Sequence, residues 1–117
     1  MNSITIYHNP KCSKSCEALD YLEQHGYQPR VINYLETPPT ADDVRRLVKQ
    51  LGIAPSSLIR APDFNRLGLA PTNDPEQLIR LIAEHPILLQ RPIVVVGERA
   101  RIARPVEVLH DFLPPAT

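Results

Sequence analysis

Cys12 is the residue of this sequence best placed for nucleophilic chemistry. It follows an apolar–polar alternation at residues 4–7 and a short polar loop, and it stands where a helix is expected to begin. The first turn of a helix presents unpaired N–H groups and a partial positive charge, and both lower the pKa of a thiol. A thiol with a pKa near 6.5 is roughly three-quarters ionised at pH 7, against about 3% for an ordinary cysteine. Because the same N–H groups bind oxyanions, the position favours a reactive thiolate over a buried structural cysteine.

Three arginines form a second group of candidate functional residues. Arg91 and Arg104 each precede a proline, one at the start of an expected strand and the other after the end of the next, and Arg60 ends an expected short helix. The planar guanidinium group donates paired hydrogen bonds that suit a tetrahedral oxyanion. Each arginine, taken alone, is explained equally well as an ordinary solvent-exposed surface residue. We expect Arg91 and Arg104 to lie at the sheet edge that holds the N-terminus of the first helix.

Cys16 has two possible roles. It shares a three-residue spacing with Leu19 and Leu22, which favours a thiol in the core. It also lies one helical turn after Cys12, where it is a possible resolving thiol. Residues four apart on a helix hold their Cβ atoms about 5–6 Å apart, wider than the ~3.5–4.5 Å of a disulfide, so a bond between them requires the first turn to unwind. No His, Cys and acidic spacing indicates a metal site, and no glycine-rich phosphate loop is present.

The elements that must position these residues occur in the order β-α-β, helices, β-β-α. Strand patterns occupy residues 4–7, 30–34, 92–96 and 99–103, and helix patterns occupy 13–25, 40–51, 55–60, 75–85 and a segment from Pro105 onward. Thr40, with Asp43 three residues on, resembles a capping box at the start of the second helix. The opening β-α-β implies a parallel pair, and the β-branched run at 92–96 indicates a buried central strand. We therefore expect an α/β fold with a mixed four-stranded sheet and a helical insertion at about 40–85, within a single domain of residues 1–117.

The composition excludes several classes of function. Thirteen basic residues balance thirteen acidic ones, which argues against binding to nucleic acid or to an anionic membrane. No apolar run approaches the ~20 residues needed to span a bilayer, and the N-terminus lacks the pattern of a signal peptide. We expect a cytoplasmic protein, in which two cysteines are better explained as thiols than as a disulfide scaffold. We also expect a monomer.

Five motifs, in order along nearly the whole chain, resemble the glutaredoxin-dependent arsenate reductase family (ArsC-like). They are YHNPKCS at residues 7–13, YLETPP at 34–39, LGLA at 67–70, RPIVV at 91–95 and ARP at 103–105. The resemblance implies a thioredoxin-like fold, which agrees with the order of elements. The sequence differs from the family pattern at two places. Cys16 stands where many members have arginine, and the segment between Arg60 and Leu67 is shorter than is common in the family.

The resemblance also implies roles for individual residues. Cys12 is the implied nucleophile, His8 helps to keep its thiol ionised, and Arg60, Arg91 and Arg104 hold the oxyanion. The peptide bond between Arg91 and its proline is implied to be cis, at a cost of only ~0.5–1 kcal/mol relative to trans.

The resulting hypothesis is an oxidoreductase of arsenical resistance that reduces arsenate to arsenite through a redox-active cysteine. No bound cofactor is expected; glutathione and glutaredoxin are the external reductants, and glutaredoxin is the protein partner. Two alternatives remain: an Spx-type redox-sensing transcriptional regulator that binds RNA polymerase, and a glutathione-linked disulfide reductase. The regulators typically carry a Cys-x-x-Cys pair, whereas Cys12 and Cys16 have three residues between them.

Overall fold

The computed structural model describes residues 3–114, and the chain forms two compact units. The first unit combines the residues up to Thr37 with those from Arg91 onward, and the second unit is Pro38–Gln90. The second unit therefore corresponds to the helical insertion expected at about 40–85. No helix within the described residues is long and apolar enough to cross a membrane.

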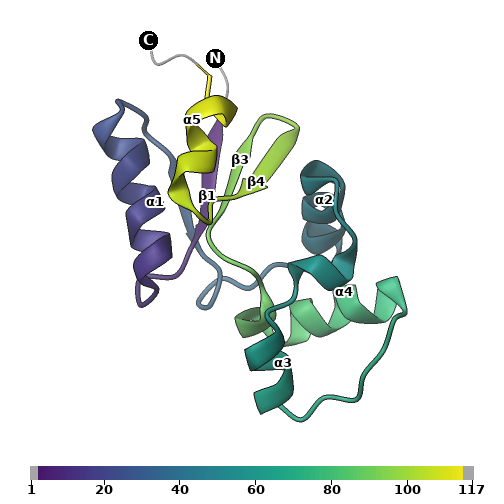
Figure 1. Ribbon diagram of the computed structural model, residues 1–117. Coiled ribbons are helices and arrows are strands. Elements are labelled where there is room, and N and C mark those ends of the chain that lie inside the picture. The colour runs from purple at the N-terminus through teal and green to yellow at the C-terminus, as the bar shows by residue number, and fades with distance from the viewer. Residues whose placement is uncertain (1–2, 115–117) are drawn as a thin grey trace. The chain divides into compact units, whose positions relative to one another are not determined.

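The first unit is built on a mixed four-stranded sheet (Figure 1). Its strands are β1 (Ile4–His8), β2 (Arg30–Asn33), β3 (Ile93–Val96) and β4 (Arg99–Ile102), in the order β2-β1-β3-β4. The pair β1 and β2 is parallel, whereas β3 is antiparallel to both β1 and β4. This arrangement confirms the predicted α/β fold and mixed sheet.

One face of this sheet carries the core of the first unit. Figure 1 shows the helices α1 (Ser13–Gln24) and α5 (Leu109–Phe112) beside the sheet, and η3 (Val106–Val108) leads into α5. Side chains that face one another across β1 and β3 pack against both helices, forming a buried cluster of Ile4, Ile6, Val94, Val96, Ala18, Leu22, Leu109 and Phe112, with Ala103 after β4. Burial of this apolar surface holds α1, and with it the residue at its N-terminus, against the end of β1.

The buried side of α1 differs from the stripe expected at Cys16, Leu19 and Leu22. Its buried residues are Ser15, Ala18 and Leu22, and Cys16 is only partly buried. The interpretation of Cys16 as a core thiol was therefore wrong. The apolar spacing gave the wrong buried face because the most N-terminal buried position of α1 is occupied by a polar residue, Ser15.

The second unit is helical. Its elements are α2 (Ala41–Leu51), η1 (Pro55–Leu58), α3 (Ala61–Arg66), α4 (Pro75–Glu84) and η2 (Pro86–Leu88). The sequence did not predict α3, a helix of six residues that begins directly after Arg60. Arg60 therefore precedes a helix, whereas it was expected to end one.

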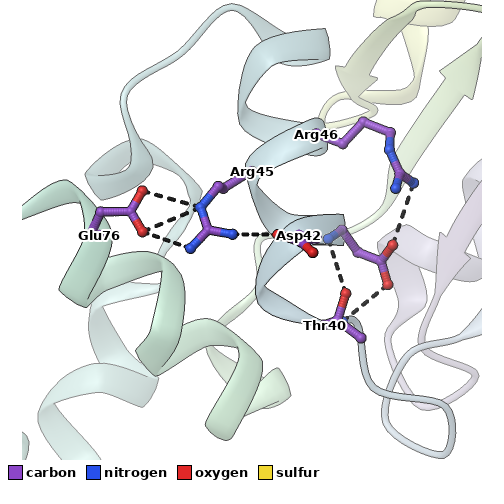
Figure 2. Close-up of polar contacts among 6 residues, drawn as sticks. Thr40, Asp42, Arg45, Arg46 and Glu76 are labelled. Carbon is purple, nitrogen blue, oxygen red and sulfur yellow. Dashed lines mark hydrogen bonds and ion pairs between the residues drawn. The ribbon is translucent and has the colours of Figure 1, made fainter.

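Capping and one ion-pair group organise the second unit. Thr40 and Asp43 form the capping box expected from the sequence, since the Thr40 hydroxyl accepts the Asp43 N–H at 3.1 Å and the Asp43 carboxylate accepts the Thr40 N–H at 3.0 Å. Figure 2 shows Arg45 of α2 between Asp42 and Glu76, with both oxygens of the Glu76 carboxylate engaged. This bidentate pair joins α2 to α4.

Candidate active site

Cys12 lies at the N-cap of α1, in a turn that begins at the end of β1. Its backbone is extended (φ −103°, ψ 120°), and its N–H donates to the Asn9 carbonyl oxygen at 3.0 Å. The Asn9 side chain accepts the N–H of Lys11, also at 3.0 Å. The Cys12 carbonyl then accepts the N–H of Cys16 and begins the helical hydrogen-bond pattern. The turn thus places the Cys12 sulfur at the N-terminus of a helix, as the sequence predicted.

Ser15 ties this turn to β1. It is fully buried at 0% exposure, and its hydroxyl lies 2.6 Å from His8 Nδ1 while accepting the Asn9 N–H at 2.9 Å. Sequence reasoning did not identify Ser15 as a functional residue. Its only signal was its place three residues after the cysteine, just beyond the YHNPKCS motif.

The electrostatic surroundings favour the Cys12 thiolate. Burial of the thiol raises its pKa, but the backbone N–H groups of Ser15 and Lys14 together with the Arg91 guanidinium outweigh it, and the pKa lies below that of an ordinary cysteine. Helix N–H groups lower the pKa because they donate to the charged sulfur, as expected for this position. The contribution of Arg91 places one of the three candidate arginines beside Cys12.

His8 ends β1 and is buried. Burial lowers its pKa, and the Ser15 backbone and the Asp20 carboxylate oppose that change without cancelling it. A histidine with a lowered pKa is neutral at pH 7, so it supplies no positive charge there. His8 contacts Ser15, whose hydroxyl binds the turn that carries Cys12, and the role of His8 in ionising the thiol stays a prediction.

Arg91 and Arg104 come together in the first unit. Arg104 Nη1 lies 3.4 Å from the Arg91 carbonyl oxygen, and the peptide bonds from both residues to the following proline are cis. The cis bond after Arg91 was expected, and the second one was not.

Arg60 belongs to the second unit, where its Nε lies 3.3 Å from a carboxylate oxygen of Asp63. Asp63 is only 5% exposed and also pairs with Arg66. An oxyanion-binding role for Arg60 stays a prediction.

Cys16 is a free thiol, as is Cys12. Its sulfur lies 3.4 Å from the Pro10 carbonyl oxygen, within the turn that precedes Cys12. No group of three or more His, Cys, Asp or Glu residues in the described part of the chain is arranged to hold a metal ion.

A mixed sheet whose first strand leads directly to a cysteine at a helix N-terminus defines a thioredoxin-like thiol protein. The ArsC family model matches residues 7–112, and the chain belongs to the ArsC family.

Similar proteins span most of the chain. It is 47% identical to an arsenate reductase of Yersinia enterocolitica over 97% of this chain and 83% of that protein. It is 42% identical to an arsenate reductase of Neisseria meningitidis serogroup B over 97% of this chain and 100% of that protein. A solved arsenate reductase structure from Vibrio cholerae is 43% identical and superimposes with a TM-score of 0.85, covering 96% of this chain and 98% of that one.

Proposed function

We propose that this protein reduces arsenate to arsenite, with the Cys12 thiolate as the nucleophile. The observation that carries the proposal is the position of the Cys12 thiol at a helix N-terminus, beside backbone N–H groups and the Arg91 guanidinium, which together favour its ionised form. The site combines a negative sulfur with donors for a second anion, which a general disulfide reductase does not require. The similarity to named arsenate reductases over nearly the whole chain supports arsenate as that anion.

The proposed reaction begins with attack of the Cys12 sulfur on arsenic. A sulfur–arsenic bond forms, and one arsenate oxygen leaves as water after protonation. The thiolate of glutathione then attacks the Cys12 sulfur, and the electron pair of the sulfur–arsenic bond moves to arsenic. Arsenic is reduced from As(V) to As(III) and leaves as arsenite, while Cys12 and glutathione are oxidised to a mixed disulfide. Glutaredoxin and glutathione reduce that disulfide by thiol exchange.

The remaining groups have proposed roles in holding the oxyanion. Arg91, Arg104 and Arg60 donate to its oxygens, and His8 supports the turn through Ser15. Cys16 is proposed to stay outside the redox cycle because its sulfur contacts the Pro10 carbonyl. We propose a monomeric cytoplasmic enzyme that works as one domain of residues 1–117, without a bound cofactor.

A coupled assay tests the proposal. NADPH oxidation is followed with glutathione, glutathione reductase and glutaredoxin, with and without arsenate. The wild-type protein is expected to show arsenate-dependent oxidation that Cys12→Ser abolishes and Cys16→Ser retains. The absence of any dependence on arsenate would contradict the proposed substrate. If activity persists in Cys12→Ser, the assignment of Cys12 as the nucleophile is wrong.

Two further measurements examine the thiols. Because the Cys12 pKa is lowered, kcat/KM is expected to rise with pH through a value below that of a free thiol and then level off. Intact-mass analysis after one turnover is expected to show a glutathione adduct on Cys12. A loss of two hydrogens without an adduct, abolished in Cys16→Ser, would assign the resolving role to Cys16.

A further inference from the structure

Tyr34 lies beside the proposed active site although the reaction above does not use it. It follows Asn33, the last residue of β2, and Asn33 is paired in register with His8 at the end of β1. The parallel pairing of β1 and β2 therefore brings Tyr34 to the same sheet edge as the turn that carries Cys12. Its side chain is among the largest fully buried ones, with 0% exposure.

The Tyr34 hydroxyl is buried but forms no hydrogen bond of normal geometry with any residue between 3 and 114. The Arg91 guanidinium and the Asn9 side chain lie within hydrogen-bonding reach of it but without normal hydrogen-bond geometry, and the Cys12 sulfur lies close enough to act on it electrostatically. Buried hydroxyl groups in native proteins are almost always paired, because an unpaired one loses its interactions with water. This hydroxyl is thus a buried donor beside the proposed anion site that has no hydrogen bond of normal geometry.

We propose that Tyr34 is a further catalytic residue, whose hydroxyl donates a hydrogen bond to an oxygen of the oxyanion that Cys12 attacks. The proposal rests on the proposed function, because it assumes that an oxyanion binds at Cys12. It gives the site a neutral, directional donor in addition to the charged guanidinium groups. Such a donor binds an oxygen of the anion but carries no positive charge that would pair with the Cys12 thiolate instead.

The state of the hydroxyl agrees with this role. Burial raises the Tyr34 pKa and the negative Cys12 raises it further, while Arg91 and Asn9 oppose them only in part. The phenol therefore stays protonated at neutral pH and remains a donor.

Tyr34→Phe separates a catalytic role from a structural one because it removes only the hydroxyl oxygen. A tyrosine that stabilises the fold by a hydrogen bond loses stability on this change. The Tyr34 hydroxyl has no hydrogen bond of normal geometry, so its replacement is expected to leave the melting temperature unchanged or to raise it. Tyr21→Phe is the matched control: Tyr21 lies in α1 stacked on His25, remote in sequence from the turn.

The binding experiment uses inorganic phosphate, an unreactive tetrahedral oxyanion. The full-length protein carrying Cys16→Ser is alkylated with iodoacetamide at increasing phosphate concentrations, and modification of Cys12 is followed by mass. Phosphate is expected to protect Cys12, and Tyr34→Phe is expected to need about tenfold more phosphate for the same protection. In the coupled assay, kcat/KM for arsenate is expected to fall by about tenfold or more.

The outcomes distinguish the two proposals. Equal protection and equal kcat/KM in Tyr34→Phe and the parent overturn the role of Tyr34 and leave the proposed function intact. A lowered melting temperature in Tyr34→Phe, but not in Tyr21→Phe, assigns Tyr34 a structural role and also overturns the inference. If phosphate fails to protect Cys12 in the parent protein, no oxyanion binds at Cys12, and this result overturns the proposed function as well as the role of Tyr34.

Discussion

Replacing Ser15 by alanine tests whether one buried hydroxyl organises the active-site turn. The Ser15 oxygen lies 2.6 Å from His8 Nδ1 and accepts the Asn9 N–H at 2.9 Å, so the change removes both interactions at once. Ser15 and both of its partners are buried, and water does not readily replace the missing oxygen. The turn that holds Cys12 then keeps its backbone hydrogen bonds but loses its tie to β1.

The magnitude follows from the two lost partners. Each buried polar group left without a hydrogen bond costs about 1–3 kcal/mol. Alanine recovers about 0.5 kcal/mol through its higher helix propensity. The free energy of unfolding is therefore expected to fall by about 1.5–5.5 kcal/mol, a large share of the ~5–15 kcal/mol typical of a domain.

Urea denaturation and thiol titration provide the assay. Ser15→Ala is expected to lower the urea midpoint with an unchanged slope, and to raise the pKa of Cys12, measured by iodoacetamide alkylation against pH. Ser57→Ala, an exposed serine of η1, is the control and is expected to change stability by less than about 0.5 kcal/mol. If Ser15→Ala is as stable as the control, or if it loses stability while the Cys12 pKa stays low, Ser15 does not organise the site.

Three other substitutions have defined expected outcomes. Arg91→Ala is expected to raise the Cys12 pKa, because a positive neighbour of the thiolate is lost, and alkylation rates against pH measure it. Thr40→Ala is expected to lower the free energy of unfolding by about 1 kcal/mol through loss of the capping box, which chemical denaturation detects. Asp63→Asn is expected to raise KM for arsenate several-fold more than it lowers kcat, because Arg60 loses the carboxylate that positions its guanidinium group. Unchanged steady-state kinetics would show that the Arg60–Asp63 pair has no role in substrate binding.

Much of the fold was predictable because the determining signals are local. The alternation of Ile4 and Ile6 and the β-branched run before Gly97 predicted β1 and β3. Thr40 with Asp43 predicted the start of α2, since a capping box needs only residues three apart. The position of Cys12 at a helix N-terminus followed from the same kind of evidence. These features depend on backbone geometry that neighbouring residues specify.

The rest of the site depends on contacts that no local pattern encodes. Ser15 was overlooked because hydrophobic periodicity weighs apolar residues, and it occupies a buried position of α1 with a hydroxyl. The helix α3 was not predicted because six residues are too few to show a period. Tyr34 was counted only as the end of a strand and the first residue of the YLETPP motif. Its place beside Arg91 depends on pairing between β1 and β2 and on a segment that returns after the helical insertion.

The sheet order has a consequence for the growing chain. Strand β1 acquires β2 as a neighbour early in synthesis, but β3 on its other side is encoded only after the whole of Pro38–Gln90. At about 5–20 residues per second, the ribosome needs on the order of ten seconds to proceed from His8 to Val96. During that interval one edge of β1 is open to foreign strands, while the inserted helices, being continuous in sequence, are completed before β3 is made. Nascent protein is therefore expected to need protection at β1, and the insertion sets how long that need lasts.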